Sequence, residues 1–190
     1  ARAAENLENI VKNNNYCIGT GFPGTPYILF ALADNGKKDA AFKMLTNEKC
    51  PSWLFEVKAG GTTIWERWDA MKEDGTRNTG ESDGTGGMVS FNHYASGAVG
   101  DFLYKRVAGI EPVEGGYKKF RIQPLVGGGI TWAKGATNTP YGRISSDWKT
   151  EENKFKISIS VPVSTNCTLV LPDGKEHVVE SGRYQFECEI

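Results

Sequence analysis

Glu66 is the residue of this chain best placed to do chemistry, because of what flanks it. Aromatic and charged side chains surround it within four positions: Trp65, Arg67, Trp68 and Asp69. Indole faces stack on the C–H faces of sugar rings, and carboxylates and guanidinium groups hydrogen-bond hydroxyl groups. Glycoside-cleaving enzymes place two carboxylates across the scissile bond. The residues therefore fit a sugar site faced by Glu66, and equally a surface carboxylate beside core tryptophans.

The neighbouring side chains have two interpretations each. Arg67 and Asp69 either orient Glu66 or pair with each other. Trp53 is predicted to belong to the core rather than to the site. His93 follows Asn92 in the run FNHY, and a histidine taken alone is more often a hydrogen-bonded core residue than a functional one.

Other kinds of site are disfavoured by composition. Four cysteines are widely spread without a CxxC pair and the chain has 2 histidines, which disfavours a zinc site. We expect no metal and no cofactor. The glycine-rich residues 80–87 lack the GK[ST] ending of a phosphate loop, and we expect an active-site loop or a linker there. A net charge of -1 argues against nucleic acid. No apolar run reaches the roughly 18–20 residues of a membrane span.

Residues 1–110 are predicted to be helical. An apolar stripe marks a helix in the opening stretch, and Thr25-Pro26 is expected to cap a second helix that stops at Asn35-Gly36. The run KKDAAFKMLTNE follows at once, which predicts an antiparallel helix pair. A further helix is expected over FNHYASGAVGDFLYKRVAG, with Ser90 as its cap.

Residues 111–190 are predicted to form strands. The run KFKISISV alternates cleanly, with Phe155, Ile157, Ile159 and Val161 on one face. Further candidates are YKKFRIQ, ITWAKGAT, YGRISSDWK, CTLVLP, HVVE and YQFECEI. Turn signals separate these runs, and their regular spacing indicates an antiparallel β-sandwich.

Four segments together resemble the C-terminal part of the inverting bacterial α-L-rhamnosidases. They are TGFPGTPYILFALADNG, PSWLFEVKAGGTTIWERWDAMKEDG, SFNHYASGAVGDFLYKRVAGI and KKFRIQPLVGGGITWAKGATNTPYGRISSDW. They span most of residues 18–150 in unbroken order, and TTIWERW and SFNHYASGAVG are the most specific. The resemblance implies a mixed fold: an all-α part of an (α/α)6 helical toroid over 1–110, then the β-sandwich over 111–190.

The resemblance also implies roles for the site residues. Glu66 corresponds to the catalytic general base, which takes a proton from the water that attacks the anomeric carbon of a rhamnose-containing glycoside. His93 corresponds to a residue that contacts the sugar. The remaining expected substrate-binding residues are Trp65, Trp68, Arg67, Asp69 and Asn92.

The match is incomplete in one respect that concerns the chemistry. The general acid of such enzymes lies in the earlier half of the toroid, and nothing before residue 18 resembles it. We therefore expect a fragment that is inactive alone, with exposed helix faces over 1–50 and 88–110 that contact the missing half or a second copy. Two alternatives remain: a carbohydrate-binding module with a platform of Trp132, Trp148 and Tyr141, and a purely structural accessory domain.

Overall fold

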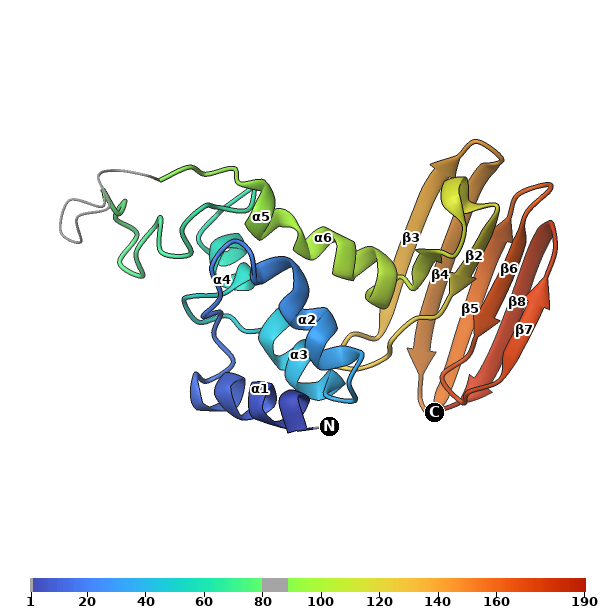
Figure 1. The fold of residues 1–190 in the computed structure, drawn as a ribbon, viewed down its shortest axis with the longest axis horizontal. Helices are drawn as coiled ribbons and strands as arrows, with labels where there is room; N and C mark the ends of the chain where they lie inside the picture. The colour runs from blue at the N-terminus through green and yellow to red at the C-terminus, as the bar shows by residue number, and fades with distance from the viewer. Residues whose placement is uncertain (1, 80–88) are drawn as a thin grey trace. The chain divides into compact units, whose positions relative to one another are not determined.

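The computed structural model describes residues 2–79 and 89–190, and it divides the chain into two compact units, Ala1–Gly100 and Asp101–Ile190 (Figure 1). The predicted glycine-rich loop at 80–87 lies outside the described residues. Across the part of the chain that is described, no helix combines the length and apolar character needed to cross a bilayer.

Three helices open the first unit: α1 (Arg2–Asn13), α2 (Thr25–Ala33) and α3 (Lys38–Leu45). The predicted pair α2–α3 is present, and Leu32, Phe42 and Met44 form its fully buried core. The predicted cap of α2 is wrong by one residue. Gly24 is the N-cap, and the Thr25 hydroxyl instead donates to the Gly21 carbonyl at 3.0 Å.

A short helix, α4 (Trp53–Lys58), precedes the Glu66 segment and was not predicted. The Ser52 hydroxyl caps it by accepting a hydrogen bond from the Phe55 N–H at 3.1 Å. Trp53 and Glu56 are the two buried residues of α4, three positions apart on one helix face. A glutamate thus occupies a position that normally takes an apolar side chain.

The last predicted helix is present but broken and shorter than expected. It starts at Tyr94, not after Ser90, because the Ser90 hydroxyl accepts from the Asn92 N–H at 3.2 Å in a local turn. Gly109 follows the helical stretch at φ 81°, and a Cβ there would lie 2.4 Å from the Pro124 nitrogen. The elements are α5 (Tyr94–Gly97), α6 (Val99–Phe102) and the π-helix η1 (Leu103–Val107).

Two four-stranded sheets form most of the second unit, in the orders β1-β2-β6-β7 and β3-β4-β5-β8 (Figure 1). The second sheet is antiparallel throughout, as predicted, whereas β2 and β6 run parallel in the first. The bounds are β1 (Ile110–Pro112), the 3-10 turn η2 (Gly115–Tyr117), β2 (Lys119–Ile122), β3 (Trp132–Thr139), β4 (Gly142–Glu151), β5 (Lys154–Val161), β6 (Asn166–Val170), β7 (Glu176–Val179) and β8 (Gly182–Glu189).

The core of the second unit confirms the alternation predicted for β5. Its four apolar residues, Phe155, Ile157, Ile159 and Val161, are all buried. Trp148 of β4 is 1% exposed and its indole N–H donates to the Val107 carbonyl at 2.8 Å. Trp148 is therefore a core residue of the second unit, and its one polar group is paired.

Candidate active site

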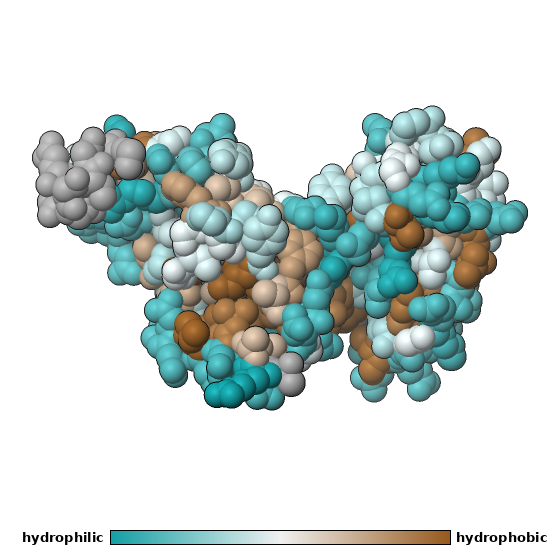
Figure 2. Space-filling view, in the orientation of Figure 1, coloured by the Kyte–Doolittle hydropathy of each residue, from teal (hydrophilic) through white to brown (hydrophobic). Residues whose placement is uncertain are grey.

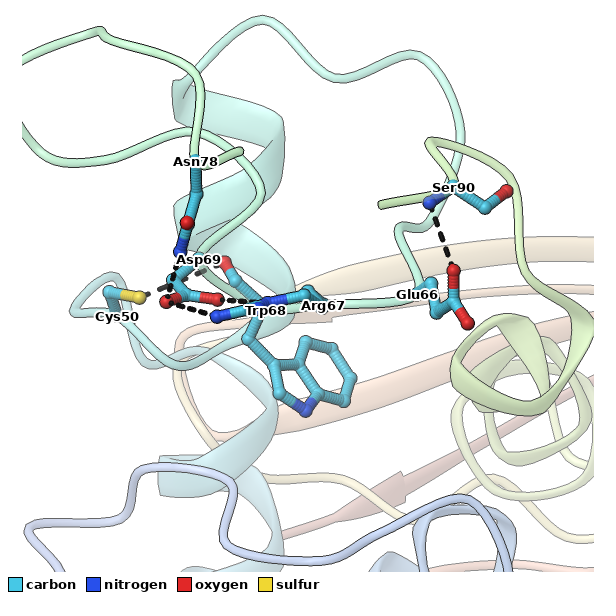
Figure 3. Close-up of polar contacts among 7 residues, drawn as sticks. All are labelled: Cys50, Glu66, Arg67, Trp68, Asp69, Asn78 and Ser90. Carbon is cyan, nitrogen blue, oxygen red and sulfur yellow. Dashed lines mark hydrogen bonds and ion pairs between the residues drawn. The ribbon is translucent and has the colours of Figure 1, made fainter. Parts of the chain in front are cut away.

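Glu66 is fixed in place by a reciprocal pair of hydrogen bonds to Ser90. The Glu66 N–H donates to the Ser90 carbonyl at 2.9 Å, and the Ser90 N–H donates to Oε2 of Glu66 at 2.9 Å. Figure 3 shows the carboxylate turned toward Ser90 with its second oxygen directed away. That oxygen accepts no hydrogen bond from the described residues, so it can meet a water or a hydroxyl group.

A pocket of about 460 Å³ lies at the first unit's surface, beside the half-buried Glu66. The pocket unites residues from four parts of the unit that are distant in sequence. Most of the surface they present is apolar, with charge only where the segment 66–69 contributes. The lining residues are Thr20, Gly21, Phe22, Thr25, Cys50, Pro51, Glu66, Arg67, Trp68, Asp69 and Ser96.

Arg67 and Asp69 pair with each other, which was one of the two predicted arrangements. Nε of Arg67 donates to Oδ1 of Asp69 at 3.0 Å, and Nη2 donates to Oδ2 at 3.2 Å. Nδ2 of Asn78 adds a third hydrogen bond to Oδ2 at 2.9 Å. In Figure 3 this cluster lies on the other side of Trp68 from the Glu66 carboxylate. We call the two Arg67–Asp69 hydrogen bonds the Arg67 fork. With the Asn78 bond they tie together residues of one loop, and both Asp69 oxygens are occupied.

The three tryptophans that cluster in the sequence, Trp53, Trp65 and Trp68, lie in different environments. Trp68 lines the pocket and meets the edge of Trp53, with ring centroids 5.5 Å apart. Trp53 is buried, as predicted, and its indole N–H donates to the Ser96 carbonyl at 3.0 Å. Trp65 is 2% exposed, packs edge-on against Phe91, and is not among the described residues that line the pocket.

His93 lies in a ladder of stacked rings beside the pocket. Its ring is 4.3 Å from that of Phe22, a pocket residue, and 5.2 Å from that of Tyr94, which is 88% exposed. Nδ1 of His93 is buried without a hydrogen-bond partner among the described residues. Asn92 is exposed and lies in the turn with Ser90. The ladder brings His93 next to the pocket, while Asn92 is not among the residues lining it.

Glu56 is the functional candidate that the sequence pattern did not single out. Its side chain is fully buried, and Oε2 accepts a hydrogen bond from the Trp65 N–H at 3.0 Å. Oε1 has no partner in the described structure. Burial raises the pKa of this carboxyl to about 7, against the lowering effect of the Trp65 N–H.

Cys50 lines the pocket, but its thiol is not activated as a nucleophile. The Cys50 thiol donates to the Trp68 carbonyl at 3.7 Å, and burial, reinforced by Asp69 and Glu73, raises its pKa to about 11. All four cysteines are free thiols. Among residues 2–79 and 89–190 no group of histidine, cysteine, aspartate and glutamate side chains could hold a metal ion.

The aromatic platform considered for the second unit does not form. Trp148 is buried in the core, whereas Trp132 on the adjacent strand is 62% exposed. Their registers explain the difference, because Trp132 pairs with Lys149 and Trp148 pairs with Ala133, so the two indoles lie on opposite faces of the sheet. The specific hypothesis of a carbohydrate-binding module that uses these rings together is therefore wrong.

Comparison with known proteins gives a family for both parts of the chain. Residues 1–107 match the bacterial α-L-rhamnosidase six-hairpin glycosidase domain, and residues 109–186 match the bacterial α-L-rhamnosidase C-terminal domain. The chain is 37% identical to an α-L-rhamnosidase of Streptomyces avermitilis over 170 residues, which is 90% of this chain and 16% of that protein. An α-L-rhamnosidase of Formosa agariphila is 37% identical over 166 residues, 87% of this chain and 17% of that protein.

Solved structures agree with the sequence comparison. The native α-L-rhamnosidase of Aspergillus terreus superposes with a TM-score of 0.91 and 39% identity over 98% of this chain and 21% of that one. The Streptomyces avermitilis enzyme complexed with L-rhamnose gives 0.90 and 32% identity, over 98% of this chain and 19% of that one. This chain thus spans about a fifth of the length of these relatives. It belongs to the bacterial α-L-rhamnosidase family, with the end of the six-hairpin domain followed by the C-terminal domain.

Proposed function

We propose that this chain supplies the general base and part of the sugar pocket for the inverting hydrolysis of terminal α-L-rhamnosides. The observation that carries the proposal is the Glu66 carboxylate, held by Ser90 at the edge of an aromatic-lined pocket with one oxygen open. The rhamnose bound in the Streptomyces avermitilis relative supports the class of substrate.

In the proposed reaction, the free oxygen of Glu66 accepts a proton from a water molecule as that water attacks C1 of the sugar. The Ser90 N–H holds the other oxygen, so the carboxylate keeps one orientation while the proton moves. Trp68 and Phe22 offer apolar surface to the sugar ring, and the ladder at His93 borders the same pocket. Inversion requires a second carboxyl group about 6.5–9.5 Å from the first, which leaves room for the water.

Asp69 does not suit the role of general acid, although it lines the same pocket. Its two oxygens accept hydrogen bonds from Arg67 and Asn78. Both oxygens are thus engaged in holding neighbouring side chains, and neither is left to meet a leaving group. We therefore infer that the general acid comes from another polypeptide segment, and that this chain alone has little or no turnover, because general base catalysis typically supplies about 10²–10⁴-fold.

Exposed apolar side chains of the first unit support a covering partner. Figure 2 shows apolar side chains gathered on the visible face of the helical unit. Ile10 is 65% exposed, Tyr27 69% and Tyr94 88%, within the ranges 1–50 and 88–110 expected to contact a partner. The preferred partner is the earlier half of the helical toroid, and self-association is the alternative. The term complete enzyme is used for this chain together with the segment that supplies the general acid.

The test is the substitution Glu66→Gln in the complete enzyme, with an aryl α-L-rhamnoside as substrate. Loss of the base should lower kcat by about 10²–10⁴-fold with a modest change in KM. The matched control is Glu73→Gln, which removes an exposed carboxylate from the same loop and should leave kcat unchanged. If Glu66→Gln keeps the parental kcat, Glu66 is not the base.

A further inference from the structure

Two consecutive backbone amides lead into the Glu66 side chain, and each is held by a different part of the first unit. The Trp65 N–H donates to the Glu56 carboxyl at 3.0 Å, and the Glu66 N–H donates to the Ser90 carbonyl at 2.9 Å. The first bond ties the segment to helix α4, and the second ties it to the turn before α5. Together they fix where the Glu66 side chain leaves the backbone.

The junction at Glu56 is tightly built. The Gly61 N–H donates to the Glu56 backbone carbonyl at 2.8 Å, so the loop after α4 folds back onto the helix. A Cβ at position 61 would lie 2.8 Å from that oxygen and 3.1 Å from the Trp65 indole. Glycine is therefore needed for the close approach of α4 and the segment that follows.

Glutamate is an unusual residue at this buried junction between α4 and the loop that follows it. The Glu56 side chain is fully buried, and Oε1 has no hydrogen-bond partner among the described residues, although buried polar atoms are nearly always paired. Its one side-chain hydrogen bond in the described structure goes to the amide directly before Glu66. A buried carboxyl with an unpaired oxygen costs free energy, and the Trp65 amide is the group that this side chain holds in the described structure.

We propose that Glu56 is a positioning residue for hydrolysis: its carboxyl holds the Trp65 amide and thereby aims Glu66 at the sugar pocket. The inference rests on the proposed function, in which Glu66 is the general base. Glu56 is not among the described residues that line the pocket, and the proposed role requires no contact with the sugar. Glu56 acts through the backbone of the residue that precedes Glu66.

The test compares three variants of the complete enzyme by steady-state kinetics on an aryl α-L-rhamnoside. Glu56→Met fills the same space but cannot accept the Trp65 N–H, and it should lower kcat about 100-fold with KM within about threefold, the effect of misplacing a catalytic group. Glu56→Gln retains an acceptor oxygen and should stay within about threefold of the parental kcat. The matched control, Ser52→Ala, removes the cap of the same helix and leaves the Trp65 amide untouched.

Ser52→Ala should lower the melting temperature and leave kcat per folded molecule unchanged, with the folded fraction measured by circular dichroism. The inference is overturned if Glu56→Met has the parental kcat, if Glu56→Gln loses as much as Glu56→Met, or if Ser52→Ala loses as much kcat. Glu66→Gln is measured in parallel. If it is inactive while Glu56→Met is fully active, the positioning role alone fails; if it is fully active, the proposed function fails and this inference with it.

Discussion

Replacing Glu56 by glutamine is predicted to remove a loss of stability that the parent chain suffers as the pH rises. In the folded chain, burial of the Glu56 carboxyl raises its pKa from 4.5 to about 7. The unfolded chain releases this proton near pH 4.5, while the folded chain keeps it until about pH 7. The folded state therefore binds more protons in this window, and the free energy of unfolding falls as the pH rises through it.

The magnitude follows from the gap between the two pKa values. A gap from 4.5 to about 7 corresponds to about 3 kcal/mol, at about 1.4 kcal/mol for each pH unit. The full stability is present below pH 4.5, and the loss is complete above pH 7. Glutamine stays neutral throughout, but its NH2 group buries two N–H donors where the protonated carboxyl buries one O–H. This cost does not change with pH, so the balance between the two proteins should shift toward Glu56→Gln as the pH rises from 4.5 to 8.

The assay is urea unfolding of the full chain at pH 5, 6, 7 and 8, followed by tryptophan fluorescence. Between pH 5 and pH 8 the advantage of Glu56→Gln over the parent should grow by about 2 to 3 kcal/mol. Glu73→Gln, at an exposed position, is the control and should follow the parent at every pH. Parallel stability curves for Glu56→Gln and the parent would refute the argument that Glu56 is buried without a compensating charge.

Three further predictions concern the Arg67 fork, the second core and the α4 junction. Asp69→Asn weakens the paired hydrogen bonds to Arg67 and should lower kcat/KM of the complete enzyme about tenfold in steady-state kinetics; an unchanged value would show that the fork is dispensable. Trp148→Ala should destabilise the second unit by about 3–5 kcal/mol in urea unfolding, and Trp148→Phe by less because only the N–H bond to Val107 and part of the ring are lost; equal losses would contradict this. Gly61→Ala forces a methyl group to 2.8 Å from a backbone oxygen and should cost about 1–3 kcal/mol in thermal unfolding, so a parental melting temperature would count against the tight junction.

Periodicity predicted the elements in which side-chain direction is set locally. The alternation of Phe155, Ile157, Ile159 and Val161 marked a half-buried strand, and all four residues are buried in the structure. Pro26 and Gly36 marked the limits of α2 approximately, because the helix begins one residue before the proline and ends at Ala33. The start of α5 could not be predicted in the same way, because the Ser90 hydroxyl serves either a helix cap or a local turn. The structure also pairs the Ser90 backbone with Glu66, a contact distant in sequence that local patterns do not show.

The candidate site was only partly predictable for a related reason. The sequence indicated that the tryptophans beside Glu66 matter, but it did not show which face the pocket and which face the core. Trp65 is buried against Phe91, while Trp68 lines the pocket. Glu56 was missed because a charged residue on a short helix normally reads as solvent-exposed. Its spacing of three from Trp53 was the one available signal that it shares the buried face.

Chemical rescue is the most direct measurement of the proposed role of Glu66. In Glu66→Ala of the complete enzyme, azide needs no base to attack C1. The C1–N bond forms as the bond between C1 and the aryloxy oxygen breaks, so added azide should restore turnover and give the inverted β-L-rhamnosyl azide. Asp69→Ala should gain no turnover from azide, since Asp69 is proposed to hold Arg67 rather than to activate water. Absence of rescue in Glu66→Ala, or an azide product of retained α configuration, would contradict the assignment of Glu66 as the general base.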